Sequence, residues 1–243
     1  MTSVYREWPL REAGRVIDCR WEQRVDARRG GYVQRVLPDG CADVVVLDGD
    51  RGVVVGPTSV VALPRLAPGS IVVGLRVRTE AIRAVFGLPA IVLRDQSVAL
   101  DEVLGSAVAR RVAAALLEPG AAADAWLVGW LSGARLDRRA AAAVGRLRES
   151  PAADVASVAQ QVGLSCRQLR RVVEHETGLG PKTLQRIGRM QRFLRLAEGA
   201  AGATGLAGWA AMAGYADQAH LSKDVHDLSG TTPARLLAER LAG

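Results

Sequence analysis

A weak internal repeat near the C-terminus constrains the fold of this chain more than any other feature. Its two copies are residues 155–173 (VASVAQQVGLSCRQLRRVV) and 205–225 (GLAGWAAMAGYADQAHLSKDV). In each copy an alanine precedes a glycine by four positions, so a small side chain lets two helices approach and the glycine can end the first helix in a left-handed conformation. One such pattern is weak because helical hairpins are common, but two in tandem predict a pair of helix-turn-helix modules. The pairs are Ala159 with Gly163 and Ala210 with Gly214.

The residues after each glycine fit the start of a second helix. Ser165 and Asp217 are of the types that cap helix N-termini. Leu169 and Leu221 then supply the apolar residue that buries each helix against its module. The predicted modules cover residues 154–175 and 205–227.

One long helix is predicted between the modules, over residues 181–198. Pro181 suits the first helical position, and apolar side chains recur along one stripe. A helix of about 18 residues spans roughly 27 Å. With the widths of the modules, it can hold two recognition helices about one DNA turn, roughly 34 Å, apart. The stripe consists of Leu184, Ile187, Met190 and Leu194.

Basic residues gather where the second helix of the first module would meet DNA. The chain has a formal net charge of +7, and Lys182 and Lys223 are its only lysines. An arginine excess by itself can reflect genomic base composition, so its placement carries the argument. Arg167, Arg170 and Arg171 follow the i, i+3, i+4 spacing that puts side chains on one helix face. On a recognition helix such arginines hold phosphate or pair with guanine.

The corresponding face of the second module is less basic. Glutamine there favours adenine, alanine can touch a thymine methyl group, and lysine can hold phosphate or guanine. The residues of this face are Gln218, Ala219, Ser222 and Lys223. The residues of the first module predicted to face DNA are Ser165, Arg167, Gln168, Arg170 and Arg171.

At these residues the sequence resembles the DNA-binding domain of the AraC/XylS family of bacterial transcription regulators. The motifs VGLSCRQLRRVVEHETGLGPKTLQRIGRMQRFLRL and AGYADQAHLSKDVHDLSGTTPARL carry the resemblance, which covers about residues 137–240. It implies seven helices, insertion of both recognition helices into successive major grooves, and activation of transcription through RNA polymerase. Val173 and Val225 depart from the aromatic residues usual in the family. Asp224, beside Lys223, would weaken that lysine's hold on phosphate.

The first third of the chain is typical of β structure. Short runs rich in valine, isoleucine and leucine are separated by turn signals such as Pro38-Asp39-Gly40, a pattern that favours an antiparallel sandwich or barrel. The runs are residues 14–25, 32–36, 42–47, 52–55, 59–63 and 71–77.

Helices are expected after this β region. Residues 79–87 predict a short helix with Thr79 as N-cap, and residues 90–95 (AIVLRD) favour a strand. Residues 101–118 and 121–132 predict two further helices. The predicted fold class is therefore α+β. A β-rich domain with a helical tail is expected over residues 1–133, and an all-α domain over residues 135–243.

The N-terminal half is similar, less specifically, to the small sensor-like domain of one AraC-type subgroup, which differs from the jelly-roll sugar sensor. The segments RVLPDGCADVVV, VVGPTS and GLRVRTEAIRAVFGLPAIVLRDQSVALDEVLG carry this resemblance. It implies an effector or interaction domain without naming a ligand. Asp39 could form a polar site with Arg76 or Arg78, although turn and surface roles explain these residues more simply. The weak candidates for an effector site are Trp21, Asp39, Cys41 and Arg76.

Cysteine usage argues against a disulfide framework or a zinc site. Cys19, Cys41 and Cys166 are odd in number and widely spaced, which fits a reducing compartment. Cys41 could be a redox sensor or simply a small buried residue. Cys166 could place DNA binding under redox control or be a neutral contact position. Neither metal-ligand spacing nor a nucleophile-elbow, phosphate-loop or dinucleotide motif is present, so we expect no metal, no cofactor and no enzyme activity. No run of 18 apolar residues predicts a membrane helix.

These features predict a cytoplasmic, sequence-specific regulator of transcription that binds duplex DNA. Its N-terminal domain would tune DNA binding by taking up a small-molecule effector, by forming a homodimer, or both. In one alternative the N-terminal domain senses nothing and serves only in dimerisation or docking. A fully packed β core would favour that alternative, and a cavity of about 300 Å³ or more would favour a sensor. The other alternative, a repair enzyme that transfers alkyl groups to a cysteine, would need an activated cysteine or a zinc–cysteine cluster.

Overall fold

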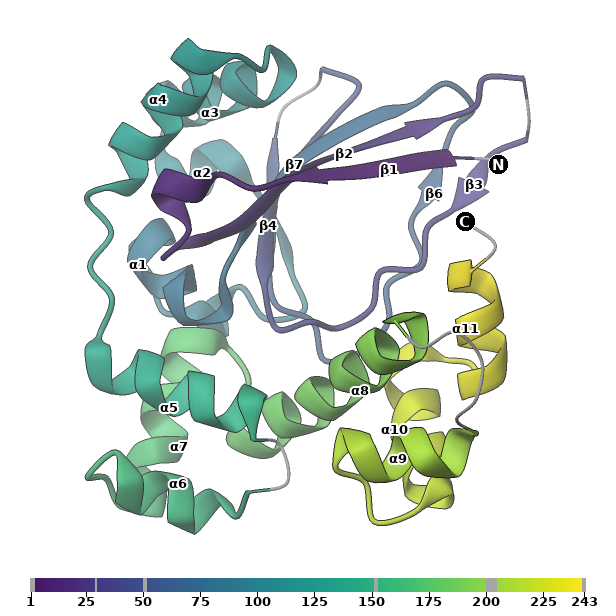
Figure 1. The fold of residues 1–243 in the computed structure, drawn as a ribbon. Helices are drawn as coiled ribbons and strands as arrows, with labels where there is room; N and C mark the ends of the chain where they lie inside the picture. Colours follow the sequence, from purple (N-terminus) through teal and green to yellow (C-terminus); the bar gives the residue numbers. More distant parts are fainter. Residues whose placement is uncertain (1–2, 29, 50–51, 151–152, 200–204, 242–243) are drawn as a thin grey trace.

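The computed structural model describes residues 3–28, 30–49, 52–150, 153–199 and 205–241. A β-rich N-terminal part is followed by a helical C-terminal part (Figure 1), which confirms the expected α+β class. The strands are β1 (Ser3–Trp8), β2 (Ile17–Val25), β3 (Tyr32–Val33), β4 (Ala42–Leu47), β5 (Val53–Val55), β6 (Arg65–Leu66), β7 (Ile71–Val77) and β8 (Ser97–Ala99). The short helices among and after them are η1 (Arg11–Ala13), η2 (Thr79–Ala81), α1 (Ile82–Phe86), η3 (Ala90–Val92), α2 (Leu100–Leu104), α3 (Ser106–Leu117) and α4 (Ala121–Leu131).

Six strands form one antiparallel sheet in the order β1-β2-β7-β4-β5-β8, and β3 pairs with β6 in a separate small sheet. Alternate residues of β4, such as Val44 and Val46, are fully buried on the face that packs against α1, α3 and α4. The opposite face holds a smaller cluster in which Trp21 and Leu66 are buried. The β3–β6 sheet thus covers part of the face that the helices leave open.

Four local predictions for the β-rich part were wrong. Residues 90–95 form η3 and a turn instead of a strand, because Ala90 and Leu93 are buried at the three-residue period of a 3-10 helix. The predicted N-cap Thr79 is itself buried within η2. Gly105, at φ 76°, divides the helix expected over 101–118 into α2 and α3. Residues 59–63 contribute one isolated bridge, Val36–Ala62, and strand β1 was not expected.

The helical part is built around a second hydrophobic core. Ala159 and Ala210 are buried where each pair of module helices meets, and the glycines that follow, Gly163 and Gly214, have φ of 66° and 88°. The predicted stripe of the long helix is buried, as are Val173 and Val225. The helices are α5 (Arg138–Glu149), α6 (Val155–Gln161), α7 (Cys166–Thr177), α8 (Pro181–Gly199), α9 (Leu206–Ala213), α10 (Gln218–Ser229) and α11 (Pro233–Leu241).

The two parts of the chain pack against each other along α8. Figure 1 shows the β-rich part on one side of this helix, with the α6–α7 pair near one end of it and the α9–α10 pair near the other. Helix α7 packs on α1, η2 and η3. Leu37, from the segment between β3 and β4, packs on the core of the helical part. The N-terminal part therefore contacts the helical part at several separate places.

Candidate nucleic-acid interface

The first recognition helix, α7, turns a basic face to solvent. Arg167, Arg170 and Arg171 are exposed, whereas Leu169 and Val173 on the opposite side are fully buried. Each guanidinium is a planar fork that can hold a phosphate or the edge of a guanine. The helix therefore presents three such groups in the spacing that a single face requires.

A capping box fixes the start of α7. The hydroxyl of Ser165 accepts a hydrogen bond from the backbone N–H of Gln168 at 3.3 Å, and Oε1 of Gln168 accepts one from the backbone N–H of Ser165 at 2.9 Å. Two N–H groups that the helix would leave unpaired are thereby satisfied. These oxygen atoms hold the helix end, and contact of the two side chains with DNA stays a prediction.

The second recognition helix, α10, begins at Asp217, whose Oδ1 accepts a hydrogen bond from the backbone N–H of His220 at 2.7 Å. The imidazole of His220 packs edge-on against Tyr215, with ring centres 5.2 Å apart. Gln218, Ala219 and Lys223 are exposed, and Ser222 is half-buried. The four side chains predicted to face DNA thus remain accessible at least in part.

Each recognition helix also carries an exposed ion pair along its length. Nε of Arg170 lies 2.8 Å from Oε1 of Glu174, and Nζ of Lys223 lies 2.8 Å from Oδ2 of Asp227. The Glu174 pairing raises the pKa of Arg170, and the Lys223 pairing lowers the pKa of Asp227. Both cations therefore already lie along the exposed surface.

The sequence predicts that Asp224 weakens the hold of Lys223 on phosphate, and in the structure Asp224 pairs with the long helix instead of with Lys223. Its carboxylate is buried and pairs with Arg186 at 2.8 Å and with Arg189 at 3.0 Å, both from α8. These pairs attach the second recognition helix to the long helix. The sequence analysis did not predict this role. The available signal was the i, i+3 spacing of the two arginines, which places them side by side on α8.

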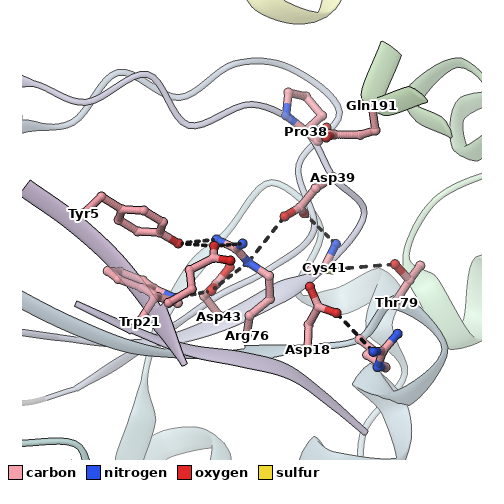
Figure 2. A network of polar contacts seen from close by, with 12 residues as sticks. Tyr5, Asp18, Trp21, Pro38, Asp39, Cys41, Asp43, Arg76, Thr79 and Gln191 are labelled. Carbon is pink, nitrogen blue, oxygen red and sulfur yellow. Dashed lines mark hydrogen bonds and ion pairs between the residues drawn. The ribbon is translucent and has the colours of Figure 1, made fainter. Parts of the chain in front are cut away.

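A polar network in the N-terminal part brings all four effector candidates together (Figure 2). Nε of Arg76 lies 3.5 Å from Oδ2 of Asp39 and 3.4 Å from Oδ1 of Asp43, and its Nη1 lies 3.1 Å from Glu7. Trp21 donates a hydrogen bond from Nε1 to Asp43 at 2.7 Å. One guanidinium thus lies within ion-pair distance of three carboxylates, while its buried Nε has no hydrogen-bond partner among the described residues.

The backbone beside Asp39 links this network to the helical part. The amide of Gln191, on α8, donates a hydrogen bond to the Pro38 carbonyl oxygen at 2.8 Å (Figure 2). The side chain of Asp39 accepts one from the backbone N–H of Cys41 at 2.8 Å. A shift of Asp39 relative to Arg76 would therefore move the segment that contacts α8.

Burial makes Asp43 and two thiols of this region resist ionisation. It raises the pKa of Asp43 to about 6, against the opposing effect of the Arg76 charge. It also raises the pKa of Cys41 well above its usual range and that of Cys19 to about 12. Thiolates are the reactive form of cysteine, so these two thiols are poorly suited to act as nucleophiles or redox sensors. Cys166 is exposed.

Two hollows among the described residues both lie outside the core of the six-stranded sheet. One, of about 200 Å³, lies between the two parts of the chain. The other, of about 230 Å³, lies at the end of the β1–β2 hairpin, beside Ser3 and Arg24. The first is lined by Asp39, Arg78 and Glu80 on one side and by Arg148, Gly188 and Gln191 on the other.

The described ranges contain no group of three or more histidine, cysteine, aspartate or glutamate side chains arranged to hold a metal ion. None of the helices there combines the length and the apolar character that a membrane span requires.

Comparison with known proteins places both parts of the chain. A family model described as "Domain of unknown function (DUF6597)" matches residues 9–99, and one described as "Helix-turn-helix domain" matches residues 158–239. No curated protein sequence matches the chain.

Solved structures of ToxT from Vibrio cholerae also match. ToxT from strain O395 is 11% identical with a TM-score of 0.47, and the match covers 98% of this chain and 97% of that one. The same protein bound to (E)-4-(8-methylnaphthalen-1-yl)but-3-enoic acid is 12% identical with a TM-score of 0.47, covering 98% and 99%. ToxT from strain SCE256 bound to an unsaturated fatty acid is 13% identical with a TM-score of 0.44, covering 86% and 90%.

The helix-turn-helix match includes both recognition helices, and the tandem motifs of residues 137–240 surround it. The chain is therefore a DNA-binding transcription regulator that joins an AraC-type helix-turn-helix domain to an N-terminal domain of the DUF6597 family.

Proposed function

We propose that α7 and α10 both enter the major groove of duplex DNA and that the protein binds a specific operator with two half-sites. The exposed face of α7, opposite a fully buried one, carries this proposal. Arginine there supplies phosphate and guanine contacts, and the less basic α10 adds contacts of the kind that favour adenine and thymine. The proposed DNA-facing residues are Ser165, Arg167, Gln168, Arg170, Arg171, Gln218, Ala219, Ser222 and Lys223.

The test is the capture of genomic DNA fragments by the purified full-length protein, followed by sequencing, at two salt concentrations. We expect one recurring motif with two half-sites about one helical turn apart. Captured DNA should fall as salt rises, because phosphate contacts release counterions. Capture of fragments without any shared motif, in both salts, would refute sequence-specific recognition by the tandem modules.

The protein is further proposed to act in the cytoplasm as an activator whose N-terminal domain modulates DNA binding or contact with RNA polymerase. The proposed domain limits are residues 1–133 and 135–243, which meet between α4 and α5. The contact of Gln191 with Pro38 supports modulation, because it joins the Arg76 network to the long helix of the DNA-binding domain. A reporter gene under the captured operator should respond less to a Gln191→Ala variant than to the wild-type protein, at equal protein levels.

A second candidate role for the N-terminal domain is docking or dimerisation without any ligand. The ion pairs within the Arg76 network favour this role over a sensor, and the two described hollows, of about 200 and 230 Å³, lie outside the sheet core and are smaller than about 300 Å³. Native mass spectrometry of full-length protein isolated from its own cells distinguishes the two. A stoichiometric small molecule would support a sensor, and apoprotein at a dimer mass would support a dimerisation module.

A further inference from the structure

The two recognition helices end in the same way. The hydroxyl of Thr177 donates a hydrogen bond to the Val173 carbonyl oxygen at 2.7 Å, and that of Ser229 donates one to the Val225 carbonyl oxygen at 2.6 Å. Each hydroxyl also accepts a hydrogen bond from the backbone N–H two residues later. A left-handed glycine follows each, at φ 72° and 70°. The helix ends are therefore equivalent positions of the internal repeat.

The N-terminal domain contacts the first of these ends closely. At Gly178, an added Cβ would lie 2.8 Å from the Ala90 carbonyl oxygen and 3.0 Å from Cγ of Pro57. Beside it, Arg83 of α1 lies 3.4 Å from the buried carboxylate of Glu176. Only glycine leaves enough room for the backbone of the N-terminal domain at this point.

The same domain contacts the second end through Arg35. Its Nη1 donates a hydrogen bond to the Ser229 carbonyl oxygen at 2.6 Å, and its Nε pairs with Glu239 of α11 at 2.9 Å. A cation at a helix C-terminus satisfies an unpaired carbonyl and suits the helix dipole. Val61 lies nearby, 3.4 Å from where a Cβ on Gly230 would be.

These contacts do not involve the side chains that are proposed to face DNA. The N-terminal domain holds the C-terminal ends of α7 and α10, whereas the exposed basic and polar side chains lie in their first two turns. Between the two contacts, Leu37 packs on the core of the helical part. The Pro38 carbonyl oxygen accepts a hydrogen bond from Gln191 of α8. Loops and short helices of one domain are thus attached to both modules and to the helix that joins them.

Resting on the proposed DNA recognition, we propose that the N-terminal domain is a brace that fixes the separation and orientation of the two recognition helices. Arg35 is the positioning residue for α10. The brace sets the number of base pairs between the two half-sites that the protein accepts. Without it, the second module would be held by the hydrophobic core that it shares with α8 and by ion pairs such as those of Asp224.

The first test measures the distance between the two recognition helices in the absence of DNA. Spin labels on Cys166 and on an Ala219→Cys variant report the distance between the recognition helices, because Cys19 and Cys41 are buried. We expect one narrow distance distribution, which should broaden in Arg35→Ala and in Glu239→Gln. Arg235→Ala is the matched control, since Arg235 pairs with Glu239 within α11 and spans no domain boundary. Circular dichroism verifies folding, and an unchanged distribution in both variants would overturn the brace.

The second test selects half-site spacing from a random DNA library with the full-length protein. The wild type and Arg235→Ala should accept one spacing. Arg35→Ala should accept several, with affinity for the original spacing reduced on the order of tenfold, as for a lost hydrogen bond to a charged group. One unchanged spacing in Arg35→Ala would refute the brace. If the wild type selects no motif, DNA recognition itself fails, and the distance measurement still decides the brace.

Discussion

Replacing Gly178 with alanine should destabilise the protein by more than backbone strain alone, and Gly163 provides a matched control. Both glycines have a positive φ, 72° and 66°, which costs an L-residue about 1–2 kcal/mol. A Cβ at Gly163 would meet no described atom within 4 Å. At Gly178 it would lie 2.8 Å from the carbonyl oxygen of Ala90, so the two domains would have to shift.

The difference between the two variants isolates the packing of the N-terminal domain on α7. Overpacking of this kind costs about 1–3 kcal/mol. We expect Gly163→Ala to lose about 1–2 kcal/mol of unfolding free energy, and Gly178→Ala about 2–5 kcal/mol. Urea denaturation of the full-length variants, followed by circular dichroism, measures both losses. Equal losses would mean that Ala90 does not pack on the end of α7 in solution. One of the two contacts on which the proposed brace depends would then be absent.

Three other predictions concern DNA contacts, pH and thiol reactivity. Arg170→Ala should lower DNA affinity and relax base preference, whereas Lys223→Ala should mainly reduce the slope of log K against log salt by about 0.9. Fluorescence anisotropy over a salt series measures both effects. An unchanged slope in Lys223→Ala would mean that α10 does not touch phosphate. The pKa of Asp43 is raised from 3.8 to about 6 in the folded protein, so the folded state binds this proton more tightly and stability should fall as pH rises from about 4 to about 6. Asp43→Asn should flatten that dependence in urea titrations, and an equal dependence in the variant would assign it to other groups. Cys166 alone should react with a thiol reagent in the native protein, the other two cysteines reacting only after unfolding, and three fast-reacting thiols would contradict their burial.

The tandem modules were predictable because their determinants are local. Ala159 and Gly163 meet within one helical hairpin, and Ser165 caps the helix that it begins. A pattern of a few residues therefore specifies both the turn and the helix after it. Strand β4 was predictable for a similar reason, since its alternation of buried valines follows the period of a strand.

The failures lie where a residue's surroundings come from far along the chain. Strand β1 is at the edge of the sheet and mostly exposed, so its sequence carries no buried alternation. The apolar residues at 90–95 suggested a strand, but Ala90 is part of the surface that receives Gly178 of the other domain. Asp224 was expected to act on its neighbour Lys223, but its burial and its pairing depend on two arginines of α8. None of these partners can be inferred from neighbouring residues.

Two kinds of ion pair in the helical domain have different consequences for its cations. Arg186 and Arg189 share the buried carboxylate of Asp224, and removing that carboxylate would take the buried counterion from both, so these two arginines hold the second module on α8. Arg170 and Lys223 pair with Glu174 and Asp227 at the surface, where ion pairs are weak and screened by salt. Phosphate can replace these carboxylates at little cost. If α7 and α10 enter DNA as proposed, the exposed pairs keep their cations extended toward it, and burial rather than the number of arginines sets which cations are accessible.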